Sequence, residues 1–297
     1  MIALAGLLLA LAPVAPPEPP VFSSATEAVY VDVFVTSHGL PVTGLSAADF
    51  EVKDDGVLQE PRLVSLETLR LTPVLVFDTS GSLEGENLEH LRSAGHAFVD
   101  GLRTDEPAAL VTFSHEIALR VPPTFDRRPL HESLDRVRAG GSTAVLDALY
   151  AALRLRWGVG RAAIVLFTDG DDNLSWLDAE AVLAAAREST ALVDVVAAGE
   201  TDPGALATAG PVHLRPAESA YMKLLREVAR TTGGTVWPCT YAGLRRAFLE
   251  VLGSLHTRYL LGYEPQGVAH TGRHRLEVKV KGRPAEVQAR TEYWVER

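Results

Sequence analysis

A short stretch at the end of an apolar run carries three oxygen-bearing side chains on alternate positions. Asp78, Ser80 and Ser82 follow the buried-strand pattern of residues 74–77, and Gly81 allows a sharp turn between the two serines. In an open α/β sheet, ligands bind beyond the carboxyl ends of the strands. A carboxylate and two hydroxyls at such a place are hard donors, which suit Mg²⁺, Mn²⁺ or Ca²⁺ and do not suit a metal that prefers thiolates.

Two later segments extend this pattern. Residues 140–144 read Gly-Gly-Ser-Thr-Ala and residues 164–170 read Ile-Val-Leu-Phe-Thr-Asp-Gly, at distances that accommodate intervening α/β units. Together with the Asp-x-Ser-x-Ser motif, these segments resemble the metal-ion-dependent adhesion site of von Willebrand factor type A domains, and the resemblance covers residues 72–257. It implies a metal site formed by Asp78, Ser80, Ser82, Thr143 and Asp169.

In that family the bound ion is Mg²⁺ or a similar cation (Mn²⁺ or Ca²⁺), and a Glu or Asp side chain of a protein partner completes its coordination. The resemblance therefore implies an adhesion-type binding protein and no enzyme activity. Two alternatives remain open: a metal-dependent hydrolase, and a scaffold that binds no metal. Against the hydrolase, the sequence contains no GxSxG, P-loop or HExxH motif.

The same residues also have ordinary structural interpretations. Asp78 and Ser80 could cap the helix that follows them, Thr143 could cap the next helix, and Asp169 could belong to a plain turn. Beside the proposed site, Asp171 with Asp172, or Glu84 with Glu86, could bind a second cation or simply face solvent. Asp147 could hold the neighbouring loop through hydrogen bonds or lie on the surface.

Composition narrows the class of partner. The chain has 297 residues and a formal net charge of -10, which disfavours nucleic acid and anionic membranes as partners.

Residues 2–12 are apolar and residues 13–20 are rich in proline, so we expect residues 1–20 to be an export signal and linker. This predicts a secreted, periplasmic or envelope-associated protein without a membrane span in the mature chain, the alternative being an uncleaved anchor. The single cysteine, Cys239, excludes an internal disulfide.

Residues 71–257 alternate between buried-strand and helical patterns. This alternation predicts a doubly wound, mostly parallel α/β sheet with helices on both faces. Residues 117–121 are expected to form an edge strand, for which an antiparallel direction stays open. The sequence also predicts a helix over 130–137 that Gly140 and Gly141 terminate, followed by a helix over 144–156 with Ser142 or Thr143 as its N-cap.

The two ends of the chain carry β patterns. We expect residues 21–70 and 258–297 to fold together as a small β-sandwich into which the domain of residues 71–257 is inserted, the alternative being two separate β extensions. Asp54-Asp55-Gly56 signals a hairpin. The layout, with Tyr259-Leu260-Leu261-Gly262-Tyr263 after the insert, resembles a bacterial family of von Willebrand factor A-related proteins. In such domains ligand binding can shift the last helix, here residues 243–256.

Overall fold

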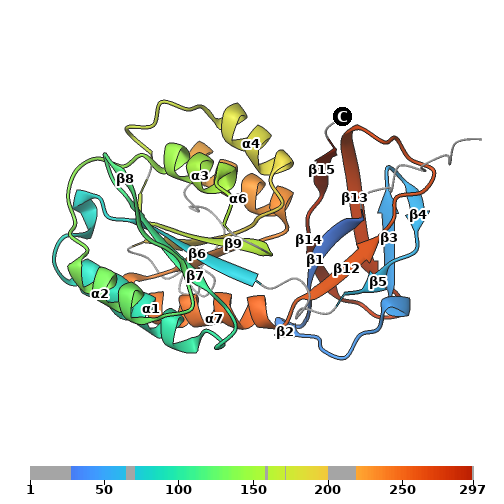
Figure 1. Ribbon diagram of the computed structural model, residues 1–297, viewed down its shortest axis with the longest axis horizontal. Helices are drawn as coiled ribbons and strands as arrows, with labels where there is room; N and C mark the ends of the chain where they lie inside the picture. The colour runs from blue at the N-terminus through green and yellow to red at the C-terminus, as the bar shows by residue number, and fades with distance from the viewer. Residues whose placement is uncertain (1–27, 65–70, 158–159, 171, 200–218, 296–297) are drawn as a thin grey trace, which may run out of the picture.

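The computed structural model describes residues 28–64, 71–157, 160–170, 172–199 and 219–295. The predicted export signal and linker, residues 1–20, lie outside these ranges, as do residues 65–70 of the N-terminal flank. Within the described ranges, two lobes lie side by side: an α/β lobe and a lobe of β-strands (Figure 1).

The α/β lobe is built on a six-stranded sheet with the order β11-β10-β9-β6-β7-β8. All neighbours are parallel except β8, which pairs with β7 in the antiparallel sense at the edge. The central strands are apolar runs buried on both faces, as the sequence pattern predicted. The strands are β6 (Leu71–Asp78), β7 (Ala108–Phe113), β8 (Ile117–Thr124), β9 (Arg161–Thr168), β10 (Leu192–Ala198) and β11 (Val236–Cys239).

Helices cover both faces of this sheet, which confirms the predicted α/β architecture (Figure 1). On one face, Phe77 of the sheet meets Phe248 with ring centroids 5.4 Å apart, and Phe248 meets Phe98 at 6.1 Å. These edge-to-face contacts join the sheet to α1 and α7. One face carries α1 (Glu86–Gly101), α2 (Arg128–Arg136) and α7 (Leu244–His256); the other carries α3 (Val145–Arg154), α4 (Ala179–Glu188) and α6 (Ala220–Thr232).

The predicted helix ends around residues 137–145 are wrong. Helix α2 ends at Arg136, and α3 begins at Val145 after Ala144, whose side chain cannot cap the helix, so neither Ser142 nor Thr143 is the N-cap. Gly141 lies in the loop between them at a φ of 86°, and a Cβ there would approach Nδ1 of His115 to 2.1 Å. The two glycines therefore shape a loop that packs closely against its neighbours and do not terminate the helix.

The β lobe consists of two sheets that combine strands from both ends of the chain. In one sheet β1 pairs with β12 and β14, and in the other β3 pairs with β13. Both sheets contribute side chains to one apolar cluster, among them Val33, Phe50 and Tyr263. The strands are β1 (Val29–Ser37), β2 (Leu40–Pro41), β3 (Phe50–Asp54), β4 (Val57–Gln59), β5 (Arg62–Leu63), β12 (Tyr259–Tyr263), β13 (Gly272–Val280), β14 (Glu286–Ala289) and β15 (Glu292–Val295).

One turn of the β lobe differs from its sequence pattern, and one agrees with it. The pattern of residues 281–284, Lys-Gly-Arg-Pro, predicts a turn between two neighbouring strands, but these residues join β13 to β14, which belong to different sheets. The hairpin between β3 and β4 forms as expected, with Asp55 at a φ of 47° and Gly56 at 83°. Positive φ at both central residues is the requirement of a type I′ turn.

Buried arginines join the two lobes. Arg161, the first residue of β9, forms an ion pair with Asp32 of β1. The guanidinium of Arg258 donates to the carbonyl of Gly233 at 2.9 Å and lies over the ring of Phe34. Since β9 starts at this junction, the carboxyl ends of the parallel strands point away from the β lobe (Figure 1).

Candidate metal centre

The order of the strands places a topological switch point between β6 and β9. From β6 the chain continues to β7 and β8 on one side, and it then returns to β9, β10 and β11 on the other side. Strands β6 and β9 are therefore adjacent at the point where the strand order reverses, which is where open α/β sheets bind ligands. Asp78 is the last residue of β6, and Asp169 directly follows β9.

Four of the five predicted site residues are linked there by hydrogen bonds. The backbone N–H of Ser80 donates to Oδ1 of Asp78 at 2.9 Å, and the hydroxyls of Ser80 and Ser82 lie 3.0 Å apart. Ser82 Oγ donates to Oδ1 of Asp169 at 3.0 Å. Thr168 Oγ1 donates to the second oxygen of Asp78, also at 3.0 Å. We call Asp78, Ser80, Ser82 and Asp169 the oxygen corner.

The loop that carries Thr143 contacts the turn of the oxygen corner through the backbone of Gly141. The N–H of Gly81 donates to the carbonyl of Gly141 at 3.0 Å, which ties the loop of residues 140–144 to the turn after β6. Thr143 is 6% exposed, and its own N–H donates to Oδ1 of Asn173 at 2.8 Å. In the described part of the chain, its side chain makes no hydrogen bond to the other four residues.

The electrostatics of the oxygen corner are unfavourable as they stand. Asp78 has no exposed surface, and burial raises the pKa of its carboxyl to about 6, against the lowering effect of the Ser80 hydrogen bonds. The nearby charge of Asp169 raises the same pKa further. Among the described residues, no lysine, arginine or histidine forms an ion pair with either carboxylate. A cation at this place would remove the repulsion between them.

Tyr241 belongs to this site and was not foreseen. Its hydroxyl donates to Oδ2 of Asp169 at 2.7 Å, so that both oxygens of this carboxylate accept a hydrogen bond. Tyr241 begins the 3₁₀ turn Tyr241–Gly243, which leads directly into α7. The two residues lie 72 positions apart, and no local sequence pattern indicates their contact.

The loop after β9 is held by two carboxylates. Asp172 accepts from the N–H of Leu146 at 2.8 Å and from Oγ of Ser175 at 2.6 Å. Asp147 accepts from the N–H groups of Trp176 and Leu177, at distances between 3.0 and 3.2 Å. Of the two roles left open for Asp147, these contacts show that it holds the loop.

Two pairs of acidic residues were considered for a second cation, and none of their described members is joined to the oxygen corner by a hydrogen bond. Asp172 is occupied with the loop contacts just described, and Asp171 lies outside the described residues. Glu84 and Glu86 are exposed at the start of α1. Neither forms a hydrogen bond with the oxygen corner in the described structure.

A separate group of ligating side chains lies in the β lobe. One carboxylate oxygen each from Asp54 and Asp55 and one ring nitrogen of His274 lie within 4.8 Å of one another. Asp54 is already bonded by protein groups: to Nδ1 of His274 at 3.0 Å, and to the hydroxyls of Tyr263 at 2.9 Å and Tyr293 at 2.6 Å. These contacts account for the group as a buried hydrogen-bond network.

None of the helices in the described ranges combines the length and the apolar character that crossing a membrane would need.

Comparison with known proteins identifies one domain family and two bacterial relatives. Residues 74–171 match the model of the von Willebrand factor type A domain. An uncharacterized protein, sll0103, from Synechocystis is 29% identical over 116 residues, which are 35% of this chain and 26% of that protein. A UPF0353 protein of Nocardia farcinica is 32% identical over 120 residues, which are 35% of this chain and 36% of that protein. The chain thus spans about a quarter to a third of these relatives.

Among solved structures, the von Willebrand factor type A protein from Catenulispora acidiphila resembles this chain with a TM-score of 0.51 and 16% identity. The match covers 91% of this chain and 75% of the other. At this identity the likeness shows a shared fold.

Proposed function

Because this chain is a von Willebrand factor type A domain protein, we propose that its oxygen corner binds a divalent cation and that the ion holds a carboxylate of a protein partner. The observation that carries this proposal is the continuous set of hydrogen bonds from Asp78 through Ser80 and Ser82 to Asp169. It brings two carboxylates and two hydroxyls together at the strand switch point.

The donor set fits a hard cation. Asp78, Ser80, Ser82 and Asp169 offer oxygen alone, which favours Mg²⁺, Mn²⁺ or Ca²⁺. Two carboxylates balance the charge of such an ion. The ion in turn offsets the free-energy cost of keeping Asp78 charged while it is buried, a cost that its raised pKa reflects. Thr143, on the loop fastened to Gly81, is the fifth residue that we assign to the site. When bound, the ion supplies a positive centre that attracts a Glu or Asp side chain of the partner.

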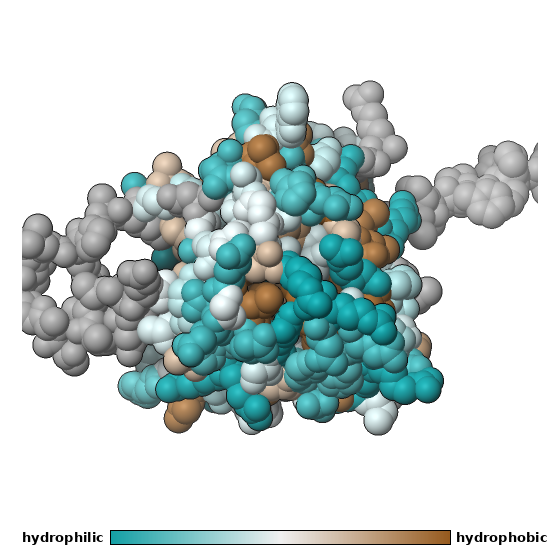
Figure 2. Space-filling view, turned by 90° about the vertical axis from the view of Figure 1, so that its left-hand side faces the viewer, coloured by the Kyte–Doolittle hydropathy of each residue, from teal (hydrophilic) through white to brown (hydrophobic). Residues whose placement is uncertain are grey.

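The loop beside the oxygen corner offers a contact surface for that partner. Trp176 is 94% exposed, although its backbone is fixed by the carboxylate of Asp147. A large aromatic side chain on a rigid loop costs little entropy when it is buried in an interface, and tryptophan is enriched among residues that dominate binding energy. The face of the α/β lobe seen in Figure 2 is mainly hydrophilic, with scattered hydrophobic spots. We therefore assign the partner a carboxylate and, beside it, an apolar pocket for Trp176.

A hydrolase is the weaker of the functions considered. The hydroxyls of Ser80 and Ser82 contact each other and Asp169, and within the described residues no histidine hydrogen-bonds to either. A serine nucleophile needs a neighbouring base to become reactive. We propose binding without covalent change, so that metal-dependent turnover of ester or phosphate substrates, abolished in Asp78→Ala, would contradict the proposal.

The flanks and the location are part of the same proposal. We propose that residues 21–70 and 258–297 form one β-sandwich module, with the domain of residues 71–257 inserted between them; the shared core of the two sheets supports this. The apolar stretch within residues 1–20 supports export to the periplasm, the envelope or the medium.

Calorimetric titration with Mg²⁺ and Mn²⁺ tests the metal site. We expect the unaltered protein to bind one ion and Asp78→Ala to bind at least about 100-fold more weakly, because a charged ligand is lost. Asp105→Ala is the matched control: this exposed residue precedes β7, at the opposite end of the sheet, and should leave the affinity unchanged. If the unaltered protein takes up neither ion, the scaffold alternative is correct.

A capture experiment from cell-envelope extract, in Mg²⁺ and in EDTA, tests the partner. We expect a bound protein in Mg²⁺ alone, and we expect Trp176→Ala to lose it while keeping the calorimetric Mg²⁺ signal. Equal capture in EDTA would show that the ion does not mediate binding.

A further inference from the structure

A pair of histidines joins α1 to α2 far from the oxygen donors of the first site. Nδ1 of His96 on α1 and Nδ1 of His131 on α2 lie 2.7 Å apart. The two rings are nearly parallel, with an interplanar angle of 11°, and their centroids are 5.0 Å apart. The two distances agree when both Nδ1 atoms lie on the line between the ring centres. The rings therefore meet edge to edge, with their Nδ1 atoms facing each other.

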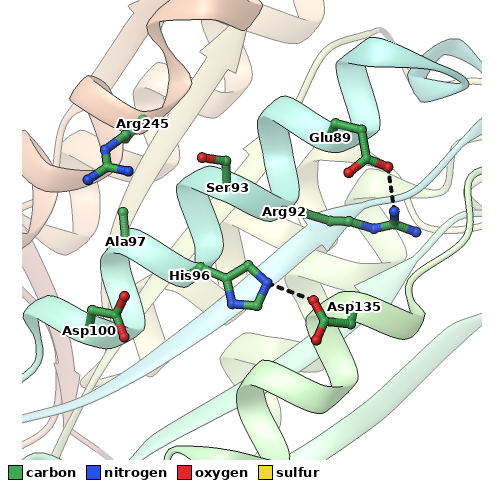
Figure 3. A pocket seen from close by; sticks show the side chains of 8 residues that line it. All are labelled: Glu89, Arg92, Ser93, His96, Ala97, Asp100, Asp135 and Arg245. Carbon is green, nitrogen blue, oxygen red and sulfur yellow. Dashed lines mark hydrogen bonds and ion pairs between the residues drawn. The ribbon is translucent and has the colours of Figure 1, made fainter.

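Each histidine also faces an aspartate of the opposite helix. Nε2 of His96 lies 2.9 Å from Oδ1 of Asp135 on α2, and Nε2 of His131 lies 3.2 Å from Oδ1 of Asp100 on α1. Both helices repeat the same spacing, a histidine followed four residues later by an aspartate. Figure 3 shows His96 pointing across the helix pair to Asp135, with Asp100 one turn further along α1. We call these four residues the histidine pair site.

The arrangement requires a positive charge between the rings. A neutral imidazole carries one proton on its two nitrogens. If both protons lie on Nε2 and are donated to the aspartates, two bare lone pairs meet at 2.7 Å. If one proton instead lies between the Nδ1 atoms of a neutral pair, a bare Nε2 faces a carboxylate. All contacts become attractive when both Nε2 atoms are protonated and a cation, a shared proton or a metal ion, lies between the Nδ1 atoms.

We propose that the histidine pair site binds a transition-metal ion, Zn²⁺ in the first place, through the two Nδ1 atoms. Histidine ligands of zinc usually donate their other ring N–H to a carboxylate, and both histidines here have that carboxylate in place. Imidazole nitrogen suits Zn²⁺, Cu²⁺ and Ni²⁺ and does not suit Mg²⁺ or Ca²⁺. The histidine pair site therefore prefers other metals than the oxygen corner does, although zinc can also occupy oxygen ligands.

The geometry needs an adjustment that the surface position permits. Zinc at tetrahedral bond lengths separates two imidazole nitrogens by about 3.3 Å, so the pair must open from its present 2.7 Å, and both rings must turn so that each Nδ1 lone pair points at the ion and not at the other nitrogen. The side chains of His96 and His131 are 29% and 30% exposed, so they can rotate, and water can fill the remaining positions. A bound ion would fasten α1 to α2.

The surrounding charges do not oppose a divalent ion. A pocket of about 360 Å³ adjoins His96, with three carboxylates and two guanidinium groups in its wall. One guanidinium, that of Arg92, is engaged by Glu89 and by the carbonyl of Val137. The wall consists of Glu89, Arg92, Ser93, His96, Ala97, Asp100, Asp135 and Arg245 (Figure 3).

The test uses the full chain carrying Asp78→Ala, which removes the oxygen corner as a competing zinc site. Calorimetry with ZnCl₂ should show one site, whose affinity falls at least about 100-fold when His96→Ala or His131→Ala is added. Asp135→Asn and Asp100→Asn should each weaken binding about 10-fold, because they remove the acceptor that holds the ring. His90→Ala is the matched control, since His90 is an exposed histidine of the same helix; it should change nothing.

A spectroscopic readout separates ligand loss from misfolding. Cu²⁺ bound to the Asp78→Ala protein should show nitrogen couplings from two imidazoles in its electron paramagnetic resonance spectrum, and one fewer after His96→Ala. Zn²⁺ should also raise the melting temperature of the Asp78→Ala protein and leave that of Asp78→Ala/His96→Ala unchanged. If zinc binding is absent in the Asp78→Ala protein, or survives both histidine substitutions, the pair holds a shared proton only and the proposal is wrong.

Discussion

Asp54 and Asp78 occupy equivalent local positions in the two lobes. Each is the last residue of a strand, β3 and β6 respectively, and each has no exposed surface. Their surroundings differ. Asp54 accepts hydrogen bonds from two tyrosine hydroxyls and faces a histidine ring nitrogen. Asp78 accepts from one backbone N–H and one threonine hydroxyl and lies near a second carboxylate.

This difference separates a structural carboxylate from a functional one. A buried charge is costly unless protein groups compensate it. Tyr263, Tyr293 and His274 compensate Asp54, and the proximity of the carboxylate raises the pKa of both tyrosines, in addition to the effect of their burial. Asp78 has less compensation, one backbone N–H and one threonine hydroxyl, and burial raises its pKa to about 6. The surplus negative charge at the oxygen corner is what a bound cation would neutralise.

The largest effect should come from breaking the compensated network. Asp54→Ala leaves the ring of His274 and two buried hydroxyls without their acceptor, and we expect the free energy of unfolding to fall by about 3–5 kcal/mol. Urea unfolding monitored by circular dichroism measures it. Glu277→Ala, an exposed position on β13, should stay within about 0.5 kcal/mol of the unaltered protein. A loss as small for Asp54→Ala as for Glu277→Ala would mean that the network carries no stability.

The second prediction has the opposite sign. The folded pKa of Asp78, about 6, exceeds its ordinary value of 3.8, so the folded state holds a proton that the unfolded state releases between these values. The contribution of Asp78 to stability therefore falls as pH rises from 3.8 to about 6 and stays constant above. Asp78→Asn should raise the free energy of unfolding by about 1–3 kcal/mol at pH 7.5 in EDTA.

Below pH 4 that gain should vanish, because Asp78 is then protonated in both states. Urea unfolding at pH 3.5 and pH 7.5 measures the difference, and the same variant should lose Mg²⁺ binding. An Asn variant that is less stable than the unaltered protein at pH 7.5 would show that Asp78 is compensated as Asp54 is.

The core of the oxygen corner could be predicted because its residues follow regular elements. Asp78 and Asp169 each come after an apolar run, and adjacent parallel strands bring their carboxyl ends to the same edge. The sequence also indicated the loop of Thr143, but it gave no sign of the backbone contact between Gly81 and Gly141 that fastens this loop. A contact between two loops leaves no periodicity in the sequence.

Contacts across long separations could not be predicted for the same reason. His274 meets Asp54 across 220 positions, and a lone histidine in a strand pattern does not indicate its partner. The histidine pair site left a weak signal, the repeated spacing of His96 to Asp100 and His131 to Asp135. The spacing places each histidine and its following aspartate on one helix face. It indicates a site only once α1 and α2 are known to pack side by side.

The smallest effect concerns the link between the oxygen corner and α7. Tyr241→Phe removes the hydrogen bond to Asp169 while keeping the ring, and we expect Mg²⁺ affinity to fall about 10-fold, because the carboxylate is then less well oriented. Tyr241 lies just before α7, and α7 leads into β12. A cation that binds Asp169 can therefore change the position of α7 through the hydrogen bond between Asp169 and Tyr241. We expect Mg²⁺ with the partner to slow proteolysis around residues 252–258, and to slow it less in Tyr241→Phe. Cleavage that is equal with and without both ligands would show that α7 does not respond to the site, even if the affinity changes as expected.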